Sequence, residues 1–294
     1  MTPEHSADLD RREIRRAFDR AAEAYDTFAV LQREVGDRAL SRLSYIQIEP
    51  KLVLDLGAGT GYCARRLEDL YKHARIVLLD IAPSMLRIAR SQARRWFSRT
   101  HYVCGDITHL GIQTGSVDFI FSNLVLQWCP DLAAVFRECA RVLRPGGLML
   151  FTTLGPDTLR ELRHAWSFVD ELPHVNLFLD MHDVGDALIG AGFSAPVLDR
   201  EHLTMTYKDL FDLMRDLKGI GAHNSLEGRR RGLTGTAAFN GVRGAYERYR
   251  TEDRLPATYE IVYGHAWAPT ANTRPQDGST VATFPFKNLG RRLP

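Results

Sequence analysis

The chain has 294 residues, of which 45% are hydrophobic and 25% charged, and its formal net charge is +2. These values are ordinary for a globular protein, and we expect no membrane partner because no apolar run is long enough to cross a bilayer. Residues 1–20 are charged and lack the apolar centre of a secretory signal. The four cysteines are widely spaced, which favours free thiols in the cytoplasm over a disulfide framework or a metal site.

Arginines gather in three parts of the sequence, despite the small net charge. They cluster within residues 11–16, 87–99 and 229–231. Each cluster fits a solvated helix face, and each also fits a docking surface for an acidic partner. RNA recognition would require aromatic side chains interleaved with the basic ones. The clusters lack this interleaving, so we expect no nucleic-acid partner.

The first half of the chain predicts two helices followed by an alternation of strands and helices. Apolar residues recur every three or four positions over residues 10–28 and 30–44, which is typical of amphipathic helices. The predicted strands cover residues 52–56, 75–80, 102–104, 117–122 and 148–153, and the helices between them cover 62–71, 83–97 and 132–143. Right-handed crossovers between such elements predict a doubly wound parallel sheet.

Beyond residue 154 this alternation ends. Helices are expected at 158–172 and 183–191, the second capped by Asp183, and strands at 197–207 and 258–267. A largely helical insert should separate these strands, and residues 269–294 should form a loose tail. We expect one domain over residues 1–268, composed of N-terminal helices (10–45), a core (50–153) and inserts (154–180 and 207–257).

A glycine-rich turn follows the first predicted strand and reads Asp-Leu-Gly-Ala-Gly-Thr-Gly from Asp55 to Gly61. Glycine lets backbone amides approach a ligand closely, although this spacing differs from that of dinucleotide sites. Asp80, Asp106 and Asn123 come at the ends of later strands, which meet at one edge of a parallel sheet. Asp80 could accept hydrogen bonds from ribose hydroxyls and Asp106 from an adenine amino group. Each residue alone fits a cap or a turn, whereas together they predict a nucleoside ligand.

Over residues 50–153 this set resembles the class I S-adenosylmethionine-dependent methyltransferases. The resemblance implies an α/β fold with a Rossmann-like seven-stranded sheet, mostly parallel with one antiparallel strand, for which residues 258–267 are our candidate. It also implies N-terminal helices, a helical lid insert, S-adenosylmethionine as the cofactor and S-adenosylhomocysteine as the product. The implied cofactor-binding residues are Asp55, Gly57, Ala58, Gly59, Gly61, Asp80, Ile81, Met85, Asp106, Ile107, Asn123 and Leu124.

Further segments, some within this core and some outside it, resemble the malonyl-acyl-carrier-protein methyltransferases of biotin synthesis. The matching segments are 16–25, 31–33, 122–128, 151–154, 165–178 and 217–222. The resemblance implies methylation of the free carboxylate of a malonyl thioester, with acyl carrier protein bearing malonyl-phosphopantetheine as an acidic partner. A carboxylate is ionised at neutral pH and needs no general base. Tyr25, Trp128 and His174 are therefore expected only to position the reactants.

The inserts supply candidates for binding the acceptor. These are Arg163, Asn176, Lys218, Arg229 and Arg230. A guanidinium group can hold either a carboxylate or a phosphopantetheine phosphate, but each basic residue also fits a solvated surface. Two other functions stay open on the same fold. One is a protein hydroxylase or assembly factor similar to a mitochondrial complex I assembly protein, and the other is a small-molecule methyltransferase.

Overall fold

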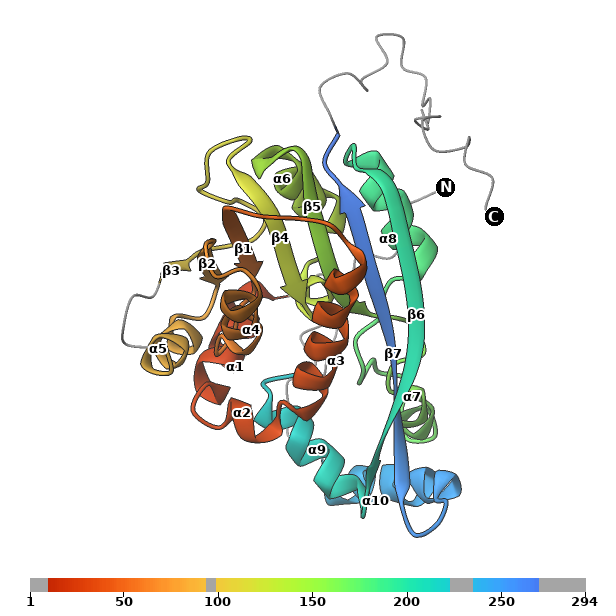
Figure 1. Ribbon diagram of the computed structural model, residues 1–294. Helices are drawn as coiled ribbons and strands as arrows, with labels where there is room; N and C mark the ends of the chain where they lie inside the picture. Colours follow the sequence, from red (N-terminus) through yellow and green to blue (C-terminus); the bar gives the residue numbers. More distant parts are fainter. Residues whose placement is uncertain (1–9, 94–98, 223–234, 270–294) are drawn as a thin grey trace, which may run out of the picture.

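A seven-stranded sheet forms the centre of the computed structural model, which describes residues 10–93, 99–222 and 235–269. Its strand order is β3-β2-β1-β4-β5-β7-β6 (Figure 1). The strands are β1 (Leu52–Leu56), β2 (Arg75–Asp80), β3 (Thr100–Cys104), β4 (Val117–Asn123), β5 (Leu143–Leu154), β6 (Ser194–Tyr207) and β7 (Leu255–Trp267). β7 runs antiparallel to both of its neighbours, whereas the other pairs are parallel. The predicted sheet with one antiparallel strand is confirmed.

Helices cover both faces of the sheet because successive side chains of a strand point to opposite sides. Val53 packs in a core with α3 and α4, whereas its neighbour Leu54 packs in a second core with α6 and α8. Short 3-10 turns η1 (Arg42–Tyr45), η2 (Leu126–Trp128) and η3 (Glu247–Tyr249) accompany the helices. The helices are α1 (Arg11–Ala21), α2 (Tyr25–Phe28), α3 (Val30–Ser41), α4 (Tyr62–Leu70), α5 (Pro83–Ser91), α6 (Leu132–Val142), α7 (Arg160–Ser167), α8 (Met181–Gly190), α9 (Leu210–Gly219) and α10 (Thr236–Tyr246).

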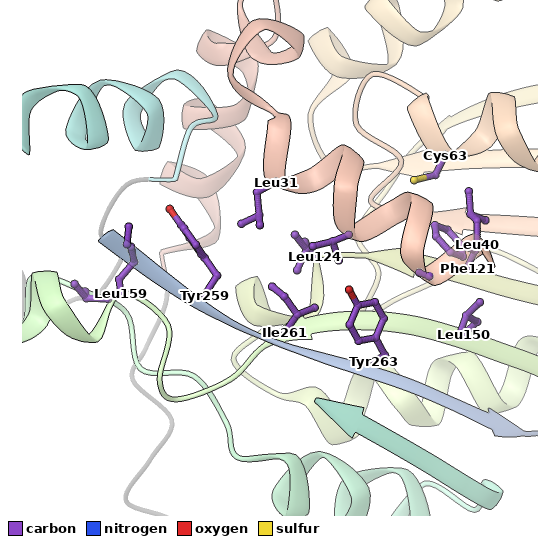
Figure 2. Close-up of a cluster of buried hydrophobic side chains, with 14 of the residues drawn as sticks. Leu31, Leu40, Cys63, Phe121, Leu124, Leu150, Leu159, Tyr259, Ile261 and Tyr263 are labelled. Atoms are coloured by element: carbon purple, nitrogen blue, oxygen red, sulfur yellow. The ribbon is translucent and has the colours of Figure 1, made fainter. Parts of the chain in front are cut away.

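Helix α3 packs on the middle of the sheet and thereby places the segment before it. Figure 2 shows Tyr259, Ile261 and Tyr263 projecting from one face of β7, on the side where Leu31 of α3 lies. All four side chains are buried. With α3 anchored in this way, α1 and α2 reach the carboxyl ends of the parallel strands (Figure 1). This edge is where open α/β sheets bind their ligands.

Several predicted boundaries differ in the structure; α7, for example, ends at Ser167 and not at residue 172. The helix expected over 10–28 breaks after Ala21, where tight turns lead into α2 at Tyr25. Asp180, and not Asp183, caps α8, because its side chain accepts a hydrogen bond from the backbone N–H of His182. β5 begins at Leu143, five positions before the predicted strand, because Leu143 pairs with Val117 of β4 and the glycine turn that follows bonds to Ala268, next to the end of β7.

The later part of the chain completes the edge of the sheet that α1 and α2 cover. α9 packs against α2, and α10 packs against α7 (Figure 1). Both helices belong to the predicted helical insert, which also includes Arg229 and Arg230, but these two arginines lie outside the described residues. The expected tail is likewise outside them, apart from its first residue. Among the residues that are described, no helix is both long and apolar enough to span a membrane.

Candidate active site

The glycine turn between β1 and α4 presents bare backbone at the sheet edge. Gly57, Gly59 and Gly61 have φ angles of 67°, 54° and 77°, which favour glycine. The N–H of Gly57 donates to the carbonyl of Leu79 at 2.7 Å and holds the turn against β2. A Cβ on Gly57 would lie 2.2 Å from a methyl group of Val125, whereas a Cβ on Gly59 would meet open space. The turn is therefore closed on one side and open on the other.

Asp80 fixes the open part of this turn. Its Oδ2 accepts a hydrogen bond from the N–H of Gly59 at 2.9 Å, and its Oδ1 accepts one from the N–H of Ala82 at 2.8 Å. Burial raises the pKa of Asp80 to about 6. The carboxyl group also borders the cavity beside the turn, so the residue predicted to hold a ribose shapes the glycine turn as well.

A first cavity of about 100 Å³ lies between the strand ends and the helices α1 and α2. Much of the predicted cofactor set lines it, namely Gly57, Gly59, Asp80, Ile81, Met85, Asp106, Ile107, Asn123 and Leu124. Gly61 does not line it, because a Cβ there would face Ala89 and Leu78 in the packing beneath α4. The carboxylate and the apolar side chains around this space suit a nucleoside.

Asp106 makes contacts that its place in the sequence does not reveal. Its Oδ1 accepts a hydrogen bond from the N–H of Thr108 at 2.8 Å, and its Oδ2 pairs with Arg11 at 3.1 Å. Partial burial acts to raise the pKa of Asp106, but the hydrogen bonds from Thr108 and then the charge of Arg11 lower it, and the net shift is downward. Arg11, known from the sequence only as part of an arginine cluster, therefore ties α1 to the turn after β3.

A second, smaller cavity of about 50 Å³ lies on the other side of the glycine turn and contains two buried acceptors without partners. Within the described part of the chain, Asp55 Oδ2 and Gln32 Oε1 find no hydrogen-bond donor. Burial and the nearby charge of Asp80 raise the pKa of Asp55 to about 8. Arg33 supplies a cation in the same lining, together with Ala58. Two acceptors and one cation complement the ammonium and carboxylate groups of an α-amino acid.

A third cavity of about 710 Å³ opens next to these two. α7, α9, α10 and the segment 174–178 contribute to its walls, which are mostly apolar. It shares Phe18, Leu124 and Trp128 with the nucleoside-sized cavity, and Tyr25 lines all three cavities. Phe18 and Trp128 meet edge to face, with ring centroids 5.5 Å apart. The three spaces thus converge at Tyr25.

Two of the predicted acceptor-binding residues, Asn176 and Lys218, line the large cavity, and so does His174, a predicted positioning residue. The ring of His174 stacks on Trp166 at 3.5 Å, and its Nε2 lies 2.7 Å from Asp170 Oδ1. Because its ring is stacked on Trp166 and hydrogen-bonded to Asp170, His174 supports the wall of the cavity.

Arg163 is not among the lining residues of the large cavity. Its guanidinium group donates to the carbonyls of Pro156 and Thr158 at 2.9 and 3.2 Å. Burial lowers the pKa of Arg163. The sequence predicts that Arg163 binds the acceptor, and this prediction is wrong in the structure. Arg163 instead supports the turn before α7, and its guanidinium group is not available to the acceptor.

Comparison with known proteins places this geometry in a family. Residues 54–151 match the family model of a methyltransferase domain. A solved structure of Haemonchus contortus phosphoethanolamine N-methyltransferase 2 in complex with S-adenosyl-L-methionine shares the fold, with a TM-score of 0.53 and 17% identity over 86% of this chain and 57% of that chain.

Two curated relatives match nearly the whole chain. The malonyl-[acyl-carrier protein] O-methyltransferase of Laribacter hongkongensis is 50% identical over 94% of this chain and 96% of its own length. The protein of the same name from Gallionella capsiferriformans is 48% identical over 95% of this chain and 98% of its own length. The chain therefore belongs to the malonyl-[acyl-carrier protein] O-methyltransferase family.

Proposed function

We propose that this protein transfers the methyl group of S-adenosylmethionine to the free carboxylate of malonyl-acyl carrier protein, in the cytoplasm, as the step that begins biotin synthesis. The observation that carries this proposal is the convergence of three cavities at Tyr25. Two small cavities suit the nucleoside and the amino-acid end of the donor, and one large cavity suits an acceptor. We further propose that residues 10–268 act as one domain, because both inserts and the N-terminal helices border the same space.

The residues around the two small cavities fit S-adenosylmethionine, which supplies a methyl group already activated by a sulfonium. Asp55, Gln32 and Arg33 would hold its amino-acid end. Asp80 would hold the ribose, while Ile81, Met85 and Ile107 offer apolar contacts for the adenine. The open space around Gly59 leaves room for the ligand beside the backbone.

The work left to the protein on the acceptor side is alignment and exclusion of water. Burial raises the pKa of Tyr25 well above its ordinary value, so its hydroxyl keeps the proton at neutral pH. A protonated hydroxyl can donate a hydrogen bond to one carboxylate oxygen and leave the other free to attack the methyl group. Trp128 and Phe18 would keep water away from this point.

Methylation assays with two carrier proteins test the proposal. The enzyme is incubated with S-adenosylmethionine labelled in the methyl group, together with malonyl- or acetyl-acyl carrier protein. We expect label on the malonyl form only, because the acetyl form lacks a free carboxylate. Label on both forms, or on neither, would overturn the proposed acceptor.

A further inference from the structure

Three amide side chains line the large cavity with oxygen atoms that find no donor among the described residues. They are Gln32, which also lines the small cavity proposed for the amino-acid end of the donor, Gln127 and Asn176. Gln127 donates from Nε2 to the carbonyl of Leu124 at 2.8 Å, while its Oε1 is buried and has no partner among the described residues. Asn176 is only 8% exposed, and its buried Oδ1 also lacks a donor there. A buried acceptor left unpaired costs about 1–3 kcal/mol, and folded proteins contain few of them. Both residues line the cavity in which the acceptor is proposed to bind.

The missing partners must be hydrogen-bond donors. A malonyl group at neutral pH offers a carboxylate and a thioester carbonyl, which only accept hydrogen bonds. It cannot satisfy Gln127 or Asn176. The phosphopantetheine arm that carries the malonyl group has two secondary amides, and each has one N–H. We propose, on the basis of the proposed function, that Gln127 and Asn176 accept hydrogen bonds from these two N–H groups and select acceptors that carry the arm.

The polar residues that line the cavity match the amide and phosphate groups of the arm. Gln127 immediately precedes Trp128, which lines both this cavity and the donor cavity. The first amide of the arm is separated from the thioester sulfur by only two methylenes, so it also belongs near this junction. Helix α9, which packs against α2, also borders the cavity and is partly exposed to solvent, with Phe211 65% exposed. Lys218 of α9 forms no ion pair within the described residues, whereas Arg215 is held by Asp212 at 2.6 Å. An unpaired lysine near solvent suits the phosphate at the far end of the arm.

The size and polarity of the cavity also favour an arm over a small free acid. Ligand cavities of about 300–1,000 Å³ bury molecules the size of drugs, and this one measures about 710 Å³. Leu159, Leu162 and Met214 give it apolar walls, which suit the dimethyl group and methylenes of the arm. Malonate alone would leave most of this surface uncovered. The arm therefore accounts for the volume as well as for the two unpaired oxygens.

Shortened acceptors test the proposal with the complete enzyme. Three malonyl thioesters are compared: that of pantetheine, which has both amides, that of N-acetylcysteamine, which has one, and that of propanethiol, which has none. The variants are Gln127→Met and Asn176→Leu, which keep the size of the side chain and remove the acceptor. Gln113→Met is the matched control, because Gln113 is exposed and does not line the cavity.

We expect each variant to lower kcat/KM for malonyl-pantetheine by about tenfold, the effect of one lost hydrogen bond of about 1.4 kcal/mol. Activity on the propanethiol ester should stay within twofold of the wild type. The N-acetylcysteamine ester should be sensitive to only one of the two variants, which identifies the residue that binds the amide nearer to the thioester. S-adenosylhomocysteine affinity, measured by calorimetry, should not change.

An equal loss on all three acceptors would show that the amides only support the wall, and no loss on any would show that water satisfies them; both results overturn the proposal. If Asn176→Leu does not fold, Gln127→Met carries the same test alone. Failure of the proposed function is distinguishable, because the wild type would then methylate none of the malonyl thioesters. Comparison of malonyl-coenzyme A with malonyl-acyl carrier protein separates the two natural sources of the arm.

Discussion

The donor and acceptor regions of this enzyme are built in different ways. The donor region consists of two cavities of about 100 and 50 Å³ whose walls are tied together by hydrogen bonds, whereas the acceptor region is one cavity of about 710 Å³ with mostly apolar walls. The donor is the same small molecule in every turnover, so two small cavities with walls fixed by hydrogen bonds can fit it. The proposed carrier-bound acceptor would have to move a long arm into and out of its cavity, which a wide apolar space permits.

Hydrogen bonds and one ion pair join the N-terminal helices to the carboxyl ends of four of the five parallel strands, β1 to β4. A residue at the end of each of these strands, or after it, binds a residue of α1, α2 or α3, so these helices complete the donor region. The ties are Asp106 to Arg11 at 3.1 Å, the Ser84 N–H to Asp19 at 2.9 Å, Thr60 to Asp26 at 2.6 Å, and Asn123 to the Gln32 carbonyl at 2.9 Å.

The largest effect on the donor region should follow from Gly57→Ala. The new methyl group would overlap Val125, and the φ of 67° disfavours any side chain. We expect affinity for S-adenosylhomocysteine to fall by about a hundredfold, the equivalent of about 2.7 kcal/mol. Calorimetry measures this loss. Gly111→Ala is the control, since a Cβ there meets nothing within 4 Å. An unchanged affinity would show that the turn does not shape the donor site.

Tyr25→Phe tests the point at which the two regions meet. Loss of the hydroxyl removes the donor proposed to align the carboxylate, so kcat should fall by about tenfold or more. Binding of S-adenosylhomocysteine should stay within threefold, because the ring remains. Tyr45→Phe serves as the control, since Tyr45 is 90% exposed. A loss of donor affinity without a fall in kcat would place Tyr25 in the donor region alone.

Asp55→Asn should change how stability depends on pH in the cofactor-free protein. Burial raises the pKa of Asp55 to about 8, so the folded protein holds a proton that the unfolded chain loses near pH 4. The free energy of unfolding of the wild type should therefore fall as pH rises from about 4 to about 8. Thermal denaturation should show the variant gaining stability over the wild type between pH 6 and pH 8.

The same variant should bind S-adenosylhomocysteine about tenfold less tightly, because an amide, unlike the carboxyl group, cannot lose a proton and become the charged partner of the ammonium group. Asp186→Asn, at an exposed position, should show neither effect. If the stability of Asp55→Asn followed that of the wild type at every pH, the buried carboxyl would titrate in its ordinary range.

The sheet and the donor region were largely predictable from the sequence. Short apolar runs ending in Gly, Asp or Asn mark the strands, and in a parallel sheet these ends must meet. Asp55, Asp80 and Asn123 could therefore be assigned to one edge before the structure was seen. The break after Ala21 could not, because Ala22, Glu23 and Ala24 favour a continuous helix. Tertiary packing decides that break, and with it the position of Tyr25.

The acceptor region was harder to predict because its chemistry depends on which polar groups remain unpaired. Arg163 has a positive charge that suits a carboxylate, but its guanidinium group already donates hydrogen bonds to two nearby backbone carbonyls. Gln32 and Gln127 lie in segments that match the family, yet an amide gives no sign in the sequence that its oxygen is unsatisfied. Only the folded packing shows this.

Arg11→Gln should loosen one of the ties that close the donor region. The Arg11–Asp106 pair is exposed, with 43% and 36% of the two side chains accessible, so we expect a loss of only about threefold in donor affinity. High salt should reduce the wild-type affinity toward that of the variant. Arg12→Gln is the control, as Arg12 is exposed and does not line the donor cavities. An equal effect of both substitutions would indicate a general charge effect and not a tie.

Lys218→Gln should have the smallest effect, and only on acceptors that end in phosphate. Its ammonium group lies on the exposed helix that borders the acceptor cavity, where water screens its charge. We expect kcat/KM for malonyl-acyl carrier protein to fall by about threefold, and that for malonyl-pantetheine, which has no phosphate, to stay unchanged. Lys72→Gln, in the loop between α4 and β2, should affect neither. Equal losses on both acceptors would place Lys218 beside the malonyl carboxylate instead, which would turn the arm around in the cavity and reverse the roles of its two ends.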